Sequence, residues 1–173
     1  MGDSMSKLQV ETISHTNNTT GLTIDSSGRV LKPNQPAFTA TIDNAAWVAM
    51  SADVKLPFDD ASTGGCFDNN GDFNTSSNRF VAPVSGSYYF FVTIYSFNSD
   101  SVNAWQVFKN GSVLQTTNSC RFDFQGGQAG SVDETVSGSV IIDLSSSDYI
   151  EIYSTTGSDY YGSYTYFGGH LIG

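Results

Sequence analysis

Oxygen-bearing side chains alternate at Asp68, Asn70 and Asp72, a spacing that could hold a divalent cation. Carboxylate and amide oxygens are the ligands that calcium prefers. The match to an EF-hand loop ends there, because Phe73 stands where that loop needs glycine and Arg79 where it needs a bidentate glutamate. Asp, Asn and Gly are also the residues of an ordinary polar turn. The run therefore has two interpretations, a calcium site or a solvated turn.

A second polar stretch, residues 157–164, has the composition of a binding loop. It has the sequence GSDYYGSY. Tyrosine supplies a broad ring face and a hydroxyl at low entropic cost, which is why binding loops use it. We expect this loop and the loop 68–74 to lie on the exposed part of the protein. The alternative is that Tyr160 and Tyr161 pack against a sheet edge or a second subunit. The candidate receptor contacts are Asp159, Tyr160, Tyr161 and Tyr164.

Catalytic groups are scarce. His15 and His170 are the only histidines, and they fall in the N-terminal segment and the last expected strand. Neither a nucleophile elbow nor a glycine-rich phosphate loop occurs. Cys66 and Cys120 lack metal-ligand spacing, so they either form a disulfide or remain buried free thiols. We expect no enzyme activity, no catalytic residue and no cofactor beyond the calcium considered above.

The charge balance excludes two classes of partner. The chain of 173 residues carries 17 acidic and 7 basic residues, a net charge of −10, and only 14% of its residues are charged. Nucleic acid and anionic membrane surfaces both need a cationic footprint. No apolar run is long enough to span a bilayer. The N-terminal run MGDSMSKLQV lacks the apolar core of a signal peptide. We therefore expect no nucleic-acid partner and no membrane insertion.

The strongest expected strand is 87–97, in which aromatic and β-branched residues dominate. Its alternation places apolar side chains on both faces. One face should meet a core, and the other should meet covering loops or a second subunit. The first face carries Tyr88, Phe90, Val92 and Ile94, and the second carries Tyr89, Phe91, Thr93 and Tyr95.

Other short strands are expected along the chain, and no stretch has helical periodicity. Asn110-Gly111 is a strong hairpin signal between two of them. We expect 136–144 to pair with 149–153 through a turn at 145–148, and 59–77 to be a loop. Many short strands with turns between them indicate a β-sandwich or jelly roll. The other expected strands are 37–42, 47–51, 54–58, 79–81, 103–108, 112–116 and 164–172.

Four motifs in order resemble the C1q globular-head family, which shares its jelly roll with tumour necrosis factor. NRFVAPVSGSYYF at 78–90 resembles the family signature, with Asn78 where glycine is usual. The others are KNG at 109–111, LSSSDYIEIY at 144–153 and YFGGHLI at 166–172. The resemblance covers 36–173 and implies an all-β, homotrimeric C1q/TNF-like jelly roll. It also implies that Tyr89, Phe91 and Tyr95 meet neighbouring chains around a threefold axis.

The segment before the head differs from it. We divide the chain into a disordered leader or cloning remnant at 1–6, a stalk at 7–35 and a head at 36–173. Residues 22–24 alternate and return through the loop 25–29 into 30–31, as in a hairpin. GLTIDSSGRV at 21–30 resembles a linker of phage tail fibres. So small a hairpin needs partners, and we expect the same segment of neighbouring chains to provide them. The alternative is that the whole segment is a disordered leader.

These features together predict a non-enzymatic virion protein, most simply a trimeric phage fibre tip. It would bind a host-surface glycan or protein, and its N-terminal segment would contact other virion proteins. One alternative is a trimeric capsid decoration or head-fibre protein without a receptor role. Another is a secreted C1q-like recognition protein, which the phage-like linker and the absence of collagen repeats disfavour.

Overall fold

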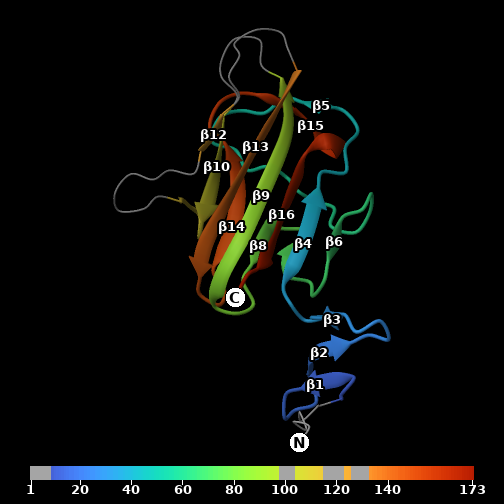
Figure 1. Ribbon diagram of the computed structural model, residues 1–173. Helices are drawn as coiled ribbons and strands as arrows, with labels where there is room; N and C mark the ends of the chain where they lie inside the picture. The colour runs from blue at the N-terminus through green and yellow to red at the C-terminus, as the bar shows by residue number, and fades with distance from the viewer. Residues whose placement is uncertain (1–8, 98–103, 115–122, 126–132) are drawn as a thin grey trace, which may run out of the picture. The chain divides into compact units, whose positions relative to one another are not determined.

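The computed structural model describes residues 9–97, 104–114, 123–125 and 133–173 (Figure 1). The chain divides into two compact units, residues 1–35 and 36–173. The described residues form β-strands and one short 3-10 turn, η1 (Gly162–Tyr164). Within them no helix is long and apolar enough to cross a membrane.

The N-terminal unit is a three-stranded antiparallel sheet in the order β1-β2-β3. Its strands are β1 (Thr12–Ser14), β2 (Thr20–Ile24) and β3 (Val30–Leu31). The Asp25 carboxylate closes the turn between β2 and β3, because it accepts the backbone N–H groups of Ser27 and Arg29 and pairs with the Arg29 guanidinium at 2.6 Å. Gly28 completes the turn with a positive φ of 78°. The expected hairpin is present, and β1 adds a third strand that the sequence did not predict.

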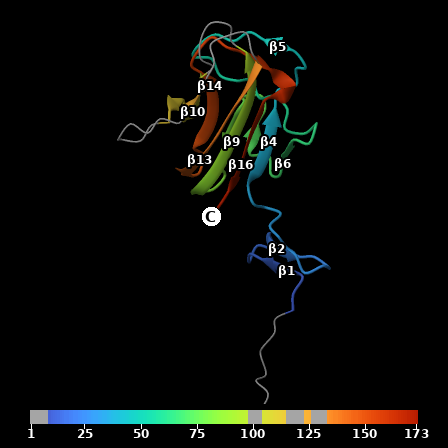
Figure 2. The ribbon, with the colours of Figure 1, turned by 45° about the horizontal axis from the view of Figure 1, so that its top comes forward.

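The head consists of two antiparallel sheets that lie face to face (Figures 1 and 2). The larger sheet contains β5 (Trp47–Val48), β15 (Asp159–Tyr161), β9 (Gly86–Phe97), β16 (Tyr166–Leu171), β4 (Ala37–Thr41) and β6 (Phe67–Asp68), with β13 (Asp133–Leu144) also paired to β9. The smaller sheet contains β11 (Ser112–Val113), β10 (Ala104–Lys109), β14 (Tyr149–Ser154), β8 (Arg79–Val81) and β7 (Phe73–Asn74), with β12 (Asp123–Gln125) also paired to β10. The architecture is the expected all-β jelly roll.

The core lies between the two sheets and is rich in aromatic rings. Phe38 stacks on Phe80 with ring centroids 5.0 Å apart, and Trp105 of the smaller sheet is fully buried. Strand β9 supplies the side chains at the centre of the larger sheet, and every second one points inward. The expected inward set is buried as predicted: Tyr88, Phe90, Val92 and Ile94.

The pairing of β13 corrects one sequence prediction. β13 does not pair with β14. It runs antiparallel to β9 along its whole length, while β14 pairs with β10 and β8 in the other sheet. The turn 145–148 therefore crosses between sheets and does not close a hairpin. The physical reason is that β14 is buried at Ile150, Glu151 and Ile152, which fits a central strand with neighbours on both sides.

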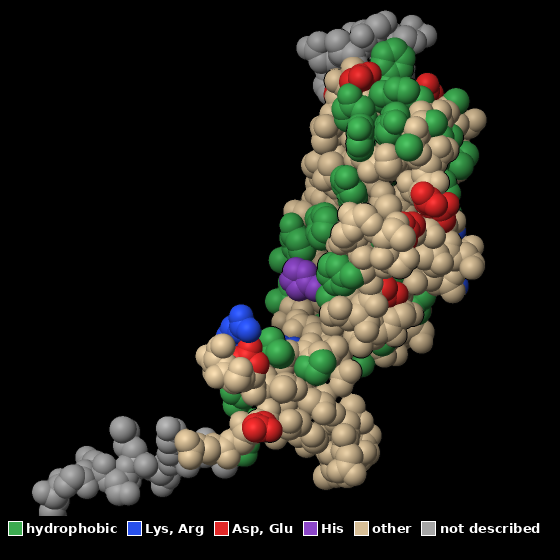
Figure 3. All heavy atoms as spheres, turned by 90° about the vertical axis from the view of Figure 1, so that its right-hand side faces the viewer, with side chains coloured by type: hydrophobic (Ala, Val, Ile, Leu, Met, Phe, Trp, Pro, Cys, Tyr) green, Lys and Arg blue, Asp and Glu red, His purple; other side chains and the backbone are tan. Residues whose placement is uncertain are grey.

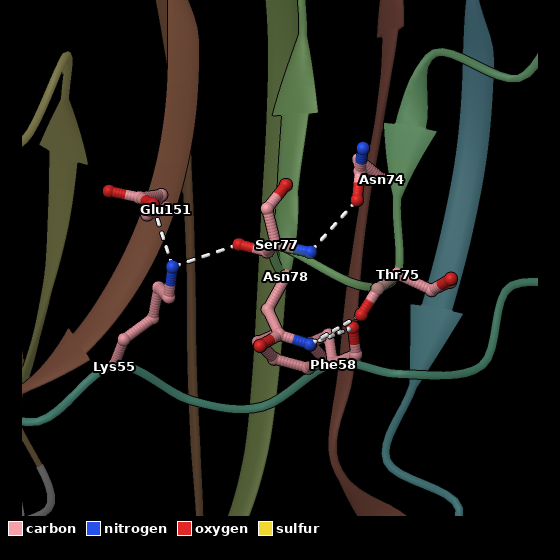
Figure 4. Close-up of polar contacts among 7 residues, drawn as sticks. All are labelled: Lys55, Phe58, Asn74, Thr75, Ser77, Asn78 and Glu151. Atoms are coloured by element: carbon pink, nitrogen blue, oxygen red, sulfur yellow. Dashed lines mark hydrogen bonds and ion pairs between the residues drawn. The ribbon is translucent and has the colours of Figure 1, made fainter.

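The segment 54–58 was expected to be a strand, and this prediction is wrong. The segment forms only a single β-bridge, from Lys55 to Tyr153. Pro57 has no N–H group to donate, so the pairing along β14 stops there. A side-chain clamp holds the segment (Figure 4). Lys55 Nζ donates to Glu151 Oε1 at 2.9 Å and to the Ser77 carbonyl at 2.8 Å. The expected loop 59–77 also contains β6 and β7.

Asn78 completes this clamp from the other side (Figure 4). Its side-chain amide donates to the carbonyls of Phe58 at 2.9 Å and Thr75 at 2.8 Å. Its φ is +49°, a region that asparagine tolerates better than other non-glycine residues. This explains why asparagine can stand where glycine is usual, and the side chain adds two hydrogen bonds that glycine cannot make.

We predict that Lys55→Met destabilises the head by on the order of 3 kcal/mol, because it leaves the Glu151 carboxylate buried without its partner. The Glu151 side chain is only 4% exposed. The double variant Lys55→Met/Glu151→Leu should recover much of the loss, since it removes both charges. Urea unfolding measures all three proteins. Equal stability of the single variant and the wild type would show that the pair contributes nothing.

Asp148 holds two turns together at one end of the head. Its carboxylate accepts from Lys109 Nζ at 2.8 Å, the Asn110 amide at 2.7 Å and the Ser145 N–H at 2.8 Å. These donors lower its pKa to about 2, with Lys109 the largest cause. Asn110 and Gly111 have φ values of +53° and +75° and form the hairpin between β10 and β11 that the sequence predicted.

The pKa of Asp148 is lower in the folded protein than in the unfolded chain, so its ionised carboxylate stabilises the fold at pH values above 3.8. This stabilisation is lost as the pH falls through about 2. We therefore predict that Asp148→Asn lowers the melting temperature at pH 7, and that its difference from the wild type shrinks as the pH falls below 3.8. Melting curves across this range measure the effect. Asp43→Asn, which changes an exposed carboxylate, is the control, and a pH-independent difference for Asp148→Asn would contradict the linkage.

Candidate functional site

The stretch 157–164 is not a loop throughout, and this corrects the placement of Tyr160. Residues 159–161 form strand β15, which pairs with the end of β9 so that Tyr160 lies opposite Ser96. Both side chains point inward, and Tyr160 is only 3% exposed. Burial raises the pKa of its phenol, and the nearby Asp59 charge adds to this rise. Tyr160 is therefore a core residue, and the prediction that it lies exposed is wrong.

The neighbours of Tyr160 have different positions. Asp159 and Tyr161 point to the outer side of the larger sheet and are half-buried, and Tyr164 on η1 is 55% exposed. Both β15 and β16 pair with β9, so η1 is a short excursion between two strands on the same edge of β9. The excursion brings Tyr164 over the outer face of β9.

Gly162 allows this excursion to pack closely. A Cβ at this position would lie 2.3 Å from the Asn44 carbonyl oxygen, which is a steric clash. Glycine has no Cβ and therefore fits. The backbone of the turn is also fixed to the segment before β5. The N–H of Gly162 donates to the Ala46 carbonyl at 3.3 Å, and that of Ser163 donates to the Asn44 carbonyl at 3.0 Å. The position of Tyr164 thus depends on a contact between segments far apart in the sequence.

Five rings meet on this part of the sheet, and we name them the aromatic patch: Trp47, Tyr95, Phe97, Tyr161 and Tyr164. Trp47 stacks on Tyr95 with centroids 5.4 Å apart, and Tyr161 stacks on Tyr164 at 4.6 Å. The Tyr95 ring meets Tyr164 edge-on at 5.6 Å, and the Trp47 ring meets Phe97 edge-on at 6.0 Å. Trp47 is 40% exposed. Figure 3 shows hydrophobic side chains gathered at the upper end of the head, bordered by acidic ones.

Two hydroxyl groups hold the rings of the aromatic patch in place. The Tyr95 phenol donates to Asp133 Oδ2 at 2.8 Å, and this hydrogen bond is the main reason that the pKa of Tyr95 is raised. The Tyr161 phenol donates to the Ala45 carbonyl at 2.9 Å. Because the rings are already packed and anchored, a ligand would meet a preformed surface and little ordering entropy would be lost. Such a surface suits the flat apolar face of a sugar ring or of another side chain.

The sequence named Tyr161 and Tyr164 as candidate receptor contacts and Tyr95 as a trimer contact. It singled out neither Trp47 nor Phe97 for this surface. Trp47 and Phe97 both lie at an end of an expected strand, 47–51 or 87–97, so the sequence did place them in β structure. What was missing was the pairing order β5-β15-β9, which brings Trp47 opposite Tyr161. That order depends on contacts across more than a hundred residues of chain, and local patterns do not carry it.

The middle of the same outer face holds the expected trimer contacts. Tyr89, Phe91 and Tyr95 are each half-buried within a single chain. A shallow hollow lies over the paired strands β9 and β13. It is lined by Tyr89, Phe91, Val92, Thr93, Ser137, Gly138 and Ser139. A Cβ on Gly168 would lie 2.4 Å from the Phe91 ring, so glycine in β16 lets this ring lie flat on the sheet. Burial of these residues by neighbouring chains stays a prediction.

The acidic run has the geometry of a turn. The Asp68 carboxylate accepts the backbone N–H groups of Gly71, Asp72 and Phe73. Burial, followed by the Asp68 charge, raises the pKa of Asp72. Among the described residues, no three His, Cys, Asp or Glu side chains are grouped so as to hold a metal. Calcium at Asp68, Asn70 and Asp72 stays a prediction. The tip of the loop is exposed as expected, but Phe73 is buried in the core.

The two cysteines fall in different parts of the chain. Cys66 is buried, and burial raises the pKa of its thiol. Cys120 lies outside the described residues. A disulfide between Cys66 and Cys120 therefore stays a prediction.

Comparison with known proteins gives the family. The model of the C1q domain matches residues 37–172. The chain belongs to the C1q domain family. The fold is similar to the globular domain of zebrafish complement 1qA protein, with a TM-score of 0.61, 19% identity, and coverage of 81% of this chain and 98% of that one. It is also similar to Eiger TNF from S. frugiperda, with a TM-score of 0.59, 11% identity, and coverage of 80% and 93%.

A bacterial relative is also similar in sequence. The uncharacterized protein YqcC of Bacillus subtilis is 32% identical over 88 residues, which are 50% of this chain and 24% of YqcC. The chain thus matches about a quarter of that relative. C1q domains are generally non-enzymatic recognition modules and typically form homotrimers, and a trimer of this chain stays a prediction.

We predict that Gly162→Ala disturbs the aromatic patch, because the new methyl group meets the Asn44 carbonyl. The turn must shift, with an expected loss of about 1–3 kcal/mol of stability. The fluorescence of Trp47 should become easier to quench with acrylamide, while Trp105 stays shielded in the core. Gly157→Ala is the matched control, because its new methyl group would make only an ordinary contact at 3.5 Å. Identical quenching and stability in both variants would contradict this account.

Proposed function

We propose that this chain is a trimeric, non-enzymatic recognition head that binds a host-surface glycan or protein at the tip of a phage appendage. The observation that carries the proposal is the aromatic patch. Its rings are exposed at Trp47 and Tyr164, yet held in fixed positions by their own chain. Exposed aromatic rings that are grouped and held rigid are typical of binding surfaces.

Charge and valency support the same function. With 7 basic residues against 17 acidic ones, the chain presents few cations for anionic partners, so contact through ring faces and hydroxyls is the more suitable chemistry. A single patch would bind a glycan weakly. Three linked patches raise the effective concentration of the second and third contacts, and this can increase avidity by a factor of about 10² or more.

The trimer itself would form through the middle of the outer face. Tyr89 and Phe91 are apolar and half-buried in one chain, which is an unfavourable state for a whole sheet face in water. Tyr95 lies where this face meets the aromatic patch, so its ring would contribute to both. In the favoured arrangement the chain is on the virion surface, and the N-terminal unit contacts other virion proteins.

The proposal predicts that Trp47→Ala/Tyr164→Ala weakens attachment to host cells about thirtyfold, the size of effect expected for losing aromatic anchors. Light scattering should still give three times the chain mass of 18.6 kDa. Phe67→Ala is the matched control, since Phe67 is 44% exposed but makes none of the ring contacts of the patch.

Each other outcome has a definite meaning. Unchanged attachment of the double variant would place the receptor site elsewhere. Dissociation of the double variant would make the patch a subunit contact. A wild-type trimer that binds no host envelope fraction would favour a capsid decoration role without a receptor.

A further inference from the structure

The N-terminal sheet has one apolar face. Ile13 pairs with Leu22, and Ile24 pairs with Val30. Directly paired residues of antiparallel strands point to the same side, as do alternate residues of one strand. All four side chains therefore share a face, which we name the stalk face. The opposite side carries Thr12, Thr23 and Leu31.

The stalk face is not covered by its own unit. Ile13 and Val30 are exposed, and Leu22 and Ile24 are only half-buried. The described residues of the unit form a single sheet of three short strands, with no second layer. The unit ends at residue 35, and a unit of fewer than about 40 residues usually needs oligomerisation or another added contact to be stable. Something must cover the face if the unit is to stay folded.

The pairing within the chain limits how partners can attach. Strand β2 already has a neighbour on each edge, and the Asp25–Arg29 ion pair closes the β2–β3 turn. The sequence suggested that neighbouring chains pair their strands. In the structure β1, β2 and β3 pair with one another within the chain, which leaves the apolar stalk face exposed for association.

We infer that the stalk face packs against the same face of two further copies of this chain, so that three sheets enclose a small apolar core around a threefold axis. This inference rests on the trimer of the proposed function. The stalk face carries no charged side chain, so identical faces meet without like-charge repulsion. The unit precedes the head directly, and a trimer of heads holds three stalk faces at high effective concentration.

The test uses two positions of equal exposure on opposite sides of the sheet. Ile13 and Leu31 are each 48% exposed. In the trimer, Ile13→Ser should speed tryptic cleavage at Arg29 and Lys32 at least tenfold, whereas Leu31→Ser should leave the cleavage rate close to that of the wild type. Light scattering of each protein reports the head trimer separately.

A second pair of variants tests the contact directly, even if Ile13→Ser unfolds the unit. After mild oxidation, Val30→Cys should give disulfide-linked chain pairs on a non-reducing gel, because the three positions would lie close to the axis. Leu31→Cys, on the other side, should not. Equal cleavage of both serine variants, or no link at position 30, in a protein that is trimeric would overturn the stalk contact and leave the recognition head intact. If light scattering gave the mass of a single chain, both the stalk contact and the proposed trimeric head would be overturned.

Discussion

The pairing of β9 with its neighbours is the constraint on which the rest of the structure depends. This strand spans Gly86–Phe97 and pairs with β13 along one edge and with β16 and β15 along the other. Its inward side chains form the centre of the core, and its outward side chains form a second apolar surface. Since a pairing shift of one residue would exchange the two sets, the same register determines both the core of the head and the side chains on its outer face.

The aromatic patch follows from that register. Because Tyr160 lies opposite Ser96, it points inward, and its neighbour Tyr161 must point outward beside Tyr95. The short turn η1 then adds Tyr164, and β5 adds Trp47 from the edge of the sheet. No single segment of the chain contains the patch. It exists because β15, η1 and β5 are ordered beside the end of β9.

The sequence predicted those features that local patterns determine. The alternation in β9 and the Asn110-Gly111 turn were found correctly, because strand periodicity and positive φ preferences act over a few residues. The family motifs then supplied the jelly roll. The failures concern pairing. The strand expected at 54–58 stops at Pro57, β13 pairs with β9 and not β14, and Tyr160 is buried by a strand that had the composition of a loop.

The opposite orientations of Tyr160 and Tyr161 have a consequence for which substitutions the head can accept. Of these two adjacent residues, Tyr160 is buried in the core and Tyr161 is half-buried on the outer face. Positions such as Trp47, Tyr161 and Tyr164 can therefore be exchanged while the inward residues stay constant. Substitutions at these outward positions would change the chemistry of the outer face while leaving the inward side chains of the core in place.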